Sequence, residues 1–395
     1  MRVVCAAIPG GGHGFPMLAV AAAFARCGHK VTFASGPVHE RDASRAGARF
    51  VELPKTPPAD FERLRPYEDA ARSARSFLPT LAETRPDVVV HDVITLGPAF
   101  AAEVLGAAVV TLVIHPLHTP SRELPPFGVG EPPGGSPVRR LWHAWMRRNN
   151  RVKDLAPARD AYNLARAGLG LAPIDHLNVG LSDRLALVAT LPSLEIMRSD
   201  WPPQAHVIGP CVWDPEPAKA VDIPPGADPL VLVAPSTAFG GSELALAAAK
   251  SVEALGVRAV FAAGKATLPD PLPAGTVSTA DGSHASVLPH ASAVICHGGH
   301  GTIVRALSHG VPCVVVPGHG DQNENAYRVE HVGAGLRVSS PDPKRLTGAL
   351  RRVLGEPSFR ARARELQLEA ASLDGPTRAA ELVEESLQRR QSAPA

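Results

Sequence analysis

The sequence has few cysteines and no pattern that would join them. The five cysteines lie far apart, without CxxC spacing, at positions 5, 27, 211, 296 and 313. An odd and scattered set argues against a disulfide framework and against a zinc site, and it fits a reducing compartment. We therefore expect neither disulfide bonds nor a zinc site.

Long hydrophobic runs are also missing. The longest, at about 104–114, falls short of the roughly 18–20 residues that span a bilayer. The apolar run 3–8, after Arg2, is broken by Pro9-Gly10 before it reaches the length of a signal-peptide core. We expect a cytoplasmic protein without an integral membrane segment.

Neither sign of charge is in excess. Lys and Arg number 40 and Asp and Glu number 38, which gives a formal net charge of +2. No basic stripe of the kind that binds nucleic acid stands out, so small-molecule partners are expected. The 395 residues, 45% of them hydrophobic, exceed what one core usually organises and predict two domains of roughly 100–200 residues each.

A dinucleotide-binding fingerprint is absent as well. Two glycine-rich turns follow apolar strands, PGGGHGFP at 9–16 and HGGHGT at 297–302. In the pattern GxGxxG, Phe15 and Val304 take the place of the last glycine, and no acidic residue ends the second strand to hold a ribose. Gly264-Lys265 lacks the first glycine and the hydroxyl of a P-loop.

What the sequence does contain is a repeated alternation of strands and helices. The first half predicts strands at 2–8, 30–34, 87–90 and 109–114 and helices at 15–27 and 99–105; the second predicts strands at 230–234, 259–263, 293–296 and 313–316 and helices at 242–255 and 302–309. Such alternation is typical of a parallel sheet covered by helices, and two doubly wound halves bind ligands at the carboxyl ends of their strands.

Composition suggests where the chain divides. We expect a first domain at 1–212, a Pro-rich linker at 213–228, a second domain at 229–373, and a C-terminal helix and tail at 374–395 that packs back on the first domain. The region 115–180 differs from its surroundings, since Pro, Arg and Trp are frequent and 141–167 has a cationic helical pattern. It is interpreted as an insertion over the cleft.

The second glycine-rich turn is suited to a phosphate. Consecutive glycines let backbone N–H groups approach an anion, the following helix adds partial positive charge, and His297 and His300 could add imidazole donors. The alternative is a tight strand-to-helix turn with surface histidines. No carboxylate or cysteine at familiar spacing completes a ligand set with this histidine pair, so no metal site is expected.

A longer pattern surrounds this turn. VICHGGHGTIVRALSHGVPCVVVP at 294–317 is followed by DQNENAYRV at 321–329 and GAG at 333–335. It resembles the nucleotide-sugar signature of family 1 glycosyltransferases of the GT-B fold, most of all the actinobacterial antibiotic glycosyltransferases that act on macrolides, enediynes and aromatic polyketides. With the Gly-His-x-x-Pro turn near the N-terminus, the resemblance covers nearly the whole chain. It implies two Rossmann-like domains facing across a cleft, the acceptor in 1–212 and the donor in 229–373.

The resemblance also implies roles for individual residues. His297 would bond the donor phosphate, the turn 299–302 would add contacts from its backbone and hydroxyl, and Asp321-Gln322 would hold the sugar hydroxyls, as a carboxylate and an amide can. The implied donor-binding residues are Ser236, Thr237, His297, Gly299, His300, Gly301, Thr302, Asp321 and Gln322.

His13 falls where the family keeps its general base, and Asp92 resembles the acidic partner that orients that histidine. A neutral imidazole can take a proton from an acceptor hydroxyl as its oxygen attacks the sugar. A lone histidine is otherwise more often structural. His91 is the rival to Asp92, but strand alternation turns the two side chains to opposite faces.

One stretch departs from the family pattern. Many relatives carry a Trp-x-Pro segment that stacks on the donor base, whereas residues 279–286 read TADGSHAS. His284 is the candidate to stack in its place, and the alternative is a solvated loop.

The expected function is that of an inverting, metal-independent glycosyltransferase without a cofactor. It would move a sugar, including a deoxysugar, from a UDP or dTDP donor to a hydroxyl of an apolar aglycone bound near 53–66 and 142–162, and act as a monomer or homodimer. Two alternatives stay open: a non-catalytic nucleotide-binding partner of a sister transferase, and a nucleotide-sugar epimerase of the same fold. His13 and Asp321-Gln322 argue against the first, and the middle insertion argues against the second.

Overall fold

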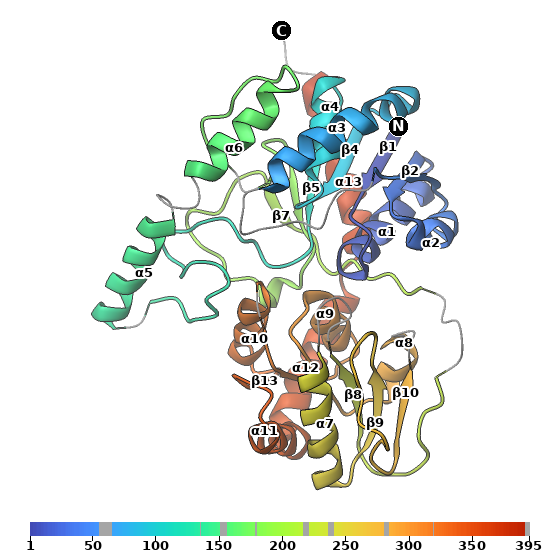
Figure 1. The fold of residues 1–395 in the computed structure, drawn as a ribbon, viewed down its shortest axis with the longest axis vertical. Helices are drawn as coiled ribbons and strands as arrows, with labels where there is room; N and C mark the ends of the chain where they lie inside the picture. The colour runs from blue at the N-terminus through green and yellow to red at the C-terminus, as the bar shows by residue number, and fades with distance from the viewer. Residues whose placement is uncertain are drawn as a thin grey trace.

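The computed structural model describes residues 1–54, 65–134, 136–150, 156–177, 180–215, 221–235, 241–279, 284–318 and 320–391. Figure 1 shows two lobes, one above the other, each built around a sheet with helices on both sides. The upper lobe holds the N-terminal half of the chain and the lower lobe most of the C-terminal half. Among the described residues, no helix combines the length and the apolar composition needed to cross a membrane.

The sheet of the first lobe has seven parallel strands. In spatial order they are β3 (Arg49–Glu52), β2 (Lys30–Ser35), β1 (Arg2–Ala6), β4 (Val88–Asp92), β5 (Ala108–Val113), β6 (Ala186–Val188) and β7 (Ala205–Val207). The helices of this lobe are α1 (Gly11–Arg26), α2 (Glu40–Arg45), α3 (Arg65–Thr84), α4 (Leu96–Val104), α5 (Pro137–Asn150) and α6 (Ala156–Ala167), with 3₁₀ turns η1 (Pro37–His39) and η4 (Pro192–Leu194). The strand order reverses between β1 and β4, the place where doubly wound sheets bind ligands.

The sheet of the second lobe has six parallel strands. In spatial order they are β10 (Thr276–Thr279), β9 (Arg258–Ala262), β8 (Leu230–Ala234), β11 (Ala293–Cys296), β12 (Cys313–Val315) and β13 (Gly335–Arg337). The helices are α7 (Ser242–Leu255), α8 (His284–Val287), α9 (His300–Ser308), α10 (Gln322–His331), α11 (Pro343–Gly355) and α12 (Pro357–Ala371), with the 3₁₀ turn η5 (Leu288–His290). Here the order reverses between β8 and β11. The prediction of two doubly wound Rossmann-like domains in a GT-B arrangement is confirmed.

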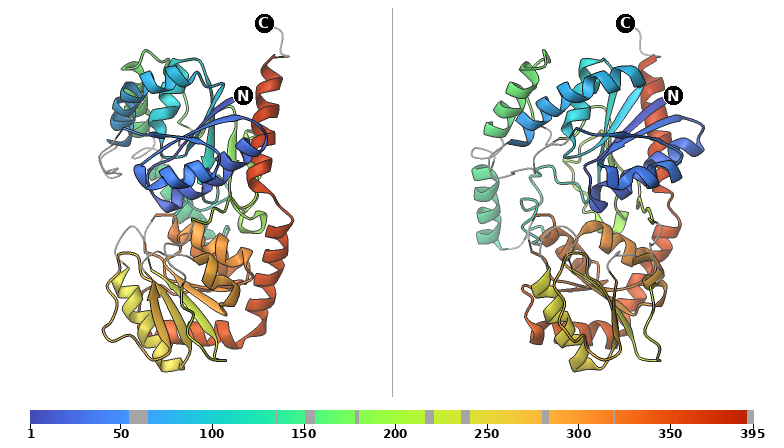
Figure 2. Two further views of the ribbon diagram at one scale, coloured as in Figure 1. Left: turned by 90° about the vertical axis from the view of Figure 1, so that its right-hand side faces the viewer. Right: turned by 45° about the vertical axis from the view of Figure 1, so that its right-hand side comes forward.

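Strand alternation decides which helices each sheet face covers. In β1, Val3 and Cys5 pack in the core formed with α1, while Val4 and Ala6 pack in the core formed with α3 and α4. The last helix, α13 (Gly375–Gln391), follows α12 of the lower lobe but adds Ala380 to the core beneath α1. Figure 2 shows it running up the side of the molecule to the upper lobe.

Some boundaries differ from the predicted ones. Helix α1 begins at Gly11 instead of residue 15, and α9 begins at His300 instead of residue 302. Glycine is a poor helix former, and this placed the predicted helix starts too late. Tertiary packing of the buried apolar residues further along each helix overrides this weak local preference. The helix expected over 141–167 is divided into α5 and α6, and residues 151–155 between them lie outside the described part of the chain.

Candidate active site

Two neighbouring strands of the first sheet bring His13 and Asp92 together. Asp92 is the last residue of β4, and His13 lies in the first turn of α1, directly after β1. The Nδ1–H group of His13 donates to Oδ1 of Asp92 at 2.9 Å. The Asp92 side chain is fully buried and that of His13 is 24% exposed. With Nδ1 engaged, Nε2 is the nitrogen left to exchange a proton.

Asp92 is held by donors on both carboxylate oxygens. Oδ1 also accepts from the backbone N–H of Ile94 at 3.0 Å, and Oδ2 accepts from Ile8 N–H at 3.2 Å and from the Thr95 hydroxyl. Burial pushes the pKa of Asp92 upward, but the charge and hydrogen bond of His13 and the other donors outweigh it and hold the pKa below its usual range. Asp92 is therefore a carboxylate that orients the imidazole.

The pKa of His13 is raised. Burial alone would lower it, but the charge and hydrogen bond of Asp92 favour the imidazolium, and the carboxylate of Asp321 in the second lobe adds to them. Asp321 acts in the same direction on His115 and His300. The residue expected to hold the sugar thus lies within electrostatic reach of the expected base.

In the second lobe, the glycine-rich turn and the Asp321-Gln322 pair are tied together. The side-chain amide of Asn325 in α10 donates to the carbonyl of Gly298 at 2.9 Å and to Oδ2 of Asp321 at 2.8 Å. Oε1 of Gln322 accepts from the backbone N–H of Gly318 at 2.9 Å. The structure therefore brings the turn and the pair to one place, at the carboxyl ends of β11 and β12.

The histidines of this region lie in different surroundings. Nδ1 of His297 is 3.5 Å from the carbonyl of Ala234, at the end of β8. His300 is buried, and burial together with the charge of His115 lowers its pKa. Burial lowers the pKa of His284 to about 4, and nearby His297 contributes. His284 and His300 are therefore neutral imidazoles at neutral pH.

The other residues of the turn are placed as follows. Gly299 precedes α9, Gly301 is exposed and Thr302 is half-buried in its first turn. Ser236 and Thr237 lie outside the described residues. The described part of the chain contains no group of three or more His, Cys, Asp or Glu arranged to hold a metal ion.

Sequence reasoning missed an aromatic cluster that follows β5. The ring centroids of His115 and His118 are 5.0 Å apart, and Phe127 lies 5.3 Å from the first and 5.9 Å from the second. Burial lowers the pKa of His115, and the charge of His13 lowers it further. Its position at the carboxyl end of a strand was the signal that could have found it.

A buried ion pair between the lobes was also missed. Arg328 of α10 is 2% exposed, and its Nη1 donates to Glu195 of the first lobe at 2.7 Å and to the carbonyl of Leu194 at 2.6 Å. Its Nε donates to Glu324 at 3.0 Å. The other carboxylate oxygen of Glu195 accepts from Leu117 N–H at 2.7 Å. The helix that begins at Gln322 is thereby fastened to the first lobe.

The histidine beside Asp92 faces away from His13. Nδ1 of His91 donates to the carbonyl of Asp92 at 2.8 Å, and Nε2 lies 2.9 Å from the Thr111 hydroxyl, within the sheet. The prediction that strand alternation separates the two side chains is confirmed.

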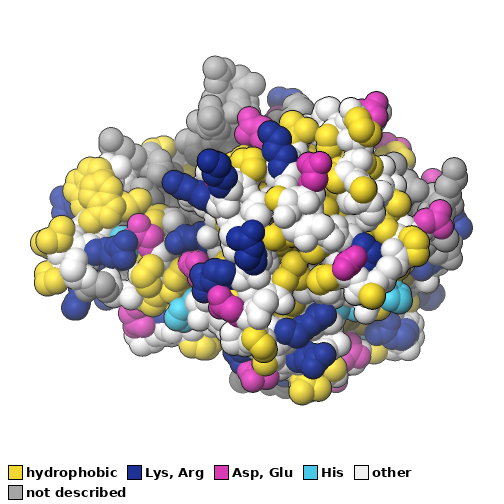
Figure 3. Space-filling model, turned by 90° about the horizontal axis from the view of Figure 1, so that it is seen from below, with side chains coloured by type: hydrophobic (Ala, Val, Ile, Leu, Met, Phe, Trp, Pro, Cys, Tyr) yellow, Lys and Arg dark blue, Asp and Glu magenta, His cyan; other side chains and the backbone are white. Residues whose placement is uncertain are grey.

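The aromatic stretch expected near the acceptor is divided between surface and core. Trp142 and Trp145 of α5 stack on each other at 4.9 Å and are more than half exposed. Figure 3 shows hydrophobic side chains gathered at the left edge of the molecule, the side on which α5 projects in Figure 1. Tyr162 instead packs against Tyr67 and Phe100 in the core. Most of the loop 53–66 lies outside the described residues.

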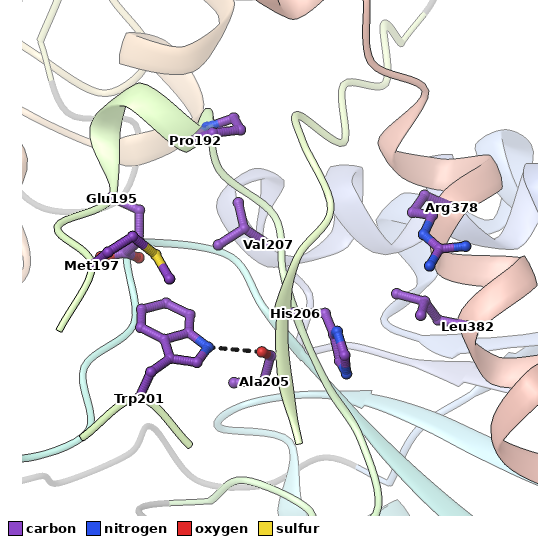
Figure 4. A pocket seen from close by; sticks show the side chains of 9 residues that line it. All are labelled: Pro192, Glu195, Met197, Trp201, Ala205, His206, Val207, Arg378 and Leu382. Atoms are coloured by element: carbon purple, nitrogen blue, oxygen red, sulfur yellow. Dashed lines mark hydrogen bonds between the residues drawn. The ribbon is translucent and has the colours of Figure 1, made fainter. Parts of the chain in front are cut away.

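A cavity of about 340 Å³ lies elsewhere, between the end strand β7 and α13. Figure 4 shows Trp201 and Glu195 on one side of it and Arg378 and Leu382 on the other. Its lining residues include neither the His13–Asp92 pair nor the residues of the glycine-rich turn at 297–302. The cavity is therefore lined by Glu195 of the ion pair and is separate from the candidate site.

The sequence is similar to that of enzymes of antibiotic biosynthesis. Residues 259–386 match the family model described as "Erythromycin biosynthesis protein CIII-like, C-terminal domain". The chain is 30% identical over 422 residues to 4'-demethylrebeccamycin synthase of Lentzea aerocolonigenes, covering 97% of this chain and 99% of that protein. A stretch of 92 residues is 47% identical to the elloramycin glycosyltransferase ElmGT of Streptomyces olivaceus and covers 23% of each chain.

Solved structures share the fold over the whole length. The glycosyltransferase of kitacinnamycin superposes with a TM-score of 0.76 at 22% identity, covering 97% of this chain and 98% of that one. The glycosyltransferase VinC, solved in complex with dTDP, superposes with a TM-score of 0.68 at 22% identity, covering 98% of this chain and all of the other. On the full-length relationship to the rebeccamycin enzyme, the chain is a glycosyltransferase and belongs to the antibiotic-biosynthesis type of GT-B glycosyltransferases.

Proposed function

We propose that this enzyme transfers a sugar, including a deoxysugar, from a UDP- or dTDP-sugar to a hydroxyl of an apolar natural-product aglycone, with inversion at the anomeric carbon. One observation carries the proposal: the His13–Asp92 pair of the first lobe lies within electrostatic reach of Asp321 in the second. The names of the rebeccamycin and elloramycin enzymes support this acceptor class, and the dTDP complex of VinC supports a dTDP donor.

The chemistry assigned to the first lobe is proton removal. Nε2 of His13 takes the proton of the acceptor hydroxyl while the oxygen attacks C1 of the sugar. The bond from C1 to the diphosphate oxygen breaks, and the nucleoside diphosphate leaves with that electron pair. Asp92 stabilises the imidazolium that forms. A single displacement assisted by one base inverts the anomeric centre.

The chemistry assigned to the second lobe is donor binding. His297 and the backbone amides of 299–302 stabilise charge on the departing diphosphate, and Ser236 and Thr237 add hydroxyl contacts. Asp321 and Gln322 hold the sugar hydroxyls. His284, neutral and close to His297, is assigned to the donor base. We propose that this set needs no metal ion and no further cofactor.

The test is an incubation of the purified enzyme with UDP- and dTDP-sugars and a panel of polyketide aglycones, read by mass spectrometry. We expect a product heavier than the aglycone by one sugar, formed equally well in the presence of EDTA. NMR of that product should show the anomeric configuration opposite to that of the donor. Retention of configuration would contradict the one-base mechanism, and nucleotide binding without any transfer would favour the auxiliary partner.

A further inference from the structure

Part of the acceptor-binding lobe lies against the sugar-binding part of the other lobe. Residues 115–130, which we call the crossing segment, follow β5 of the upper lobe and run down towards α10 and β13 of the lower lobe (Figure 1). The segment begins with His115 and ends in a turn in which Val129 N–H donates to the carbonyl of Pro126 at 3.2 Å.

The end of the crossing segment makes close contact with the donor half. The carbonyl of Gly130 accepts from Nη1 of Arg337, at the end of β13, at 2.6 Å. A methyl group built on Gly130 would overlap the carbonyl oxygen of Asn323, and one built on Gly128 would lie 3.1 Å from the carbonyl oxygen of Gly320. At Gly130 a side chain would force the backbone of the loop to move, and at Gly128 it would make a tight contact; both residues also have the positive φ that favours glycine.

These contacts surround the pair expected to hold the sugar. Gly320 and Asn323 are the residues immediately before and after Asp321-Gln322, so the turn at 126–130 lies directly over the loop that carries the pair. Within the segment, Phe127 packs on His115, whose pKa is influenced by both Asp321 and His13. The start of the crossing segment thus lies within electrostatic reach of both the expected base and the expected sugar-binding carboxylate.

The beginning of the crossing segment is fastened as well. Leu117 N–H donates to Glu195, and Glu195 pairs with Arg328 in the same helix that begins with Gln322. The segment is therefore linked to α10 through Glu195 at one end, and at the other end it contacts the Gly320–Asn323 loop and bonds Arg337.

We infer that the crossing segment forms one wall of the donor-sugar subsite, with Gly130 and Arg337 as the positioning residues that dock it. The inference rests on the proposed function and adds to it, because it makes the acceptor-binding lobe a participant in holding the donor sugar. The nucleoside diphosphate, assigned to the glycine-rich turn, does not depend on this wall. A change that weakens the docking of the crossing segment should therefore weaken the binding of a nucleotide sugar and leave the binding of the nucleoside diphosphate unchanged.

The test compares two glycine variants. Gly130 and Gly134 both have positive φ, 65° and 81°, so alanine strains the backbone similarly at each. Among the described residues that are not its chain neighbours, none comes within 4 Å of a methyl group built at Gly134. In Gly130→Ala, we expect KM for the nucleotide sugar to rise roughly tenfold, as the loss of a hydrogen bond to a charged group would give, with Kd for the nucleoside diphosphate unchanged by calorimetry. Gly134→Ala should change neither.

A second pair of variants covers the case in which Gly130→Ala does not fold. Arg337→Gln removes the guanidinium that donates to the Gly130 carbonyl and adds no atom to the contact. It should likewise raise KM for the nucleotide sugar and leave Kd for the nucleoside diphosphate unchanged. Arg345→Gln is its control, since that guanidinium bonds Ser339 and not the crossing segment.

Three results would overturn the inference. One is an unchanged KM for the nucleotide sugar in both Gly130→Ala and Arg337→Gln, and another is an equal loss of nucleotide and nucleotide-sugar binding, which would indicate general damage to the donor half. The third is a parent enzyme that binds no nucleotide at all, which refutes the proposed function itself and is recognised before any variant is compared.

Discussion

Replacing Asp92 with asparagine separates the electrostatic role of this residue from its structural one. Oδ1 accepts from His13 and Ile94, and Oδ2 accepts from Ile8 and Thr95. An amide keeps one accepting oxygen and turns an NH₂ group towards the donors on the other side. Whichever way the amide is turned, a backbone N–H of Ile8 or Ile94 loses its acceptor.

The variant should change both the stability of the fold and the pKa of His13. A buried donor left without a partner costs about 1–3 kcal/mol, so the variant should unfold more easily by about that amount. The pKa of His13 is raised above 6.5 because the Asp92 charge outweighs burial. Without that charge, burial prevails and the pKa should fall. In the proposed mechanism only the neutral imidazole of His13 can take the acceptor proton, so the acid limb of kcat/KM should move to lower pH in Asp92→Asn.

The assay is the pH dependence of kcat/KM from about pH 5 to 9 with an alcohol acceptor, since kcat/KM reports groups of the free enzyme. In the parent, the acid limb should lie above the ordinary histidine value of 6.5. Thr95→Val is the matched control: it removes one hydrogen bond from Asp92 and keeps the charge, so stability should fall and the acid limb should stay. An acid limb that Asp92→Asn leaves in place, or that both variants move equally, would refute the reasoning.

Three further predictions follow from the contacts of the site. His297→Ala should weaken donor affinity by about 1.5–3 kcal/mol in calorimetry, because a charge-assisted phosphate contact is lost; unchanged affinity would contradict its assignment. Glu195→Gln should lower the free energy of unfolding by about 3 kcal/mol, since Arg328 is buried and, of its carboxylate partners in the described part of the chain, would keep Glu324 alone. A change within error would show that the ion pair does not hold the lobes together. Replacing residues 53–66 should change acceptor preference and not donor preference, and the reverse pattern in a competition assay would reassign that loop.

The parts of the site that the sequence predicts are those that depend on one sheet. Carboxyl ends of parallel strands meet at one edge, so the residues after β1 and at the end of β4 had to come together, and His13 and Asp92 do. Alternation along β4 turned His91 the other way. The glycine-rich turn after β11 followed from the same local reasoning.

The parts that the sequence did not predict depend on how two lobes meet. Glu195 and Arg328 are 133 residues apart, and Gly130 and Arg337 are 207 apart, distances over which no local pattern carries information. Burial of His300 is likewise a tertiary effect, because its place in the motif suggests an accessible donor while its surroundings keep it neutral. Short strands such as β6 and β7, of three residues each, give too little alternation to be recognised.

The most direct test of the account is the rate of sugar transfer by His13→Ala to an alcohol acceptor, measured with saturating donor beside the parent enzyme. Removal of the general base should lower turnover by roughly 10²–10⁴-fold, while calorimetry shows unchanged affinity for the donor. An acidic phenol acceptor, which ionises with less help, should lose less. If His13→Ala transfers sugar to the alcohol at the parent's rate, His13 is a structural residue of the first turn of α1 and the proposed mechanism is wrong.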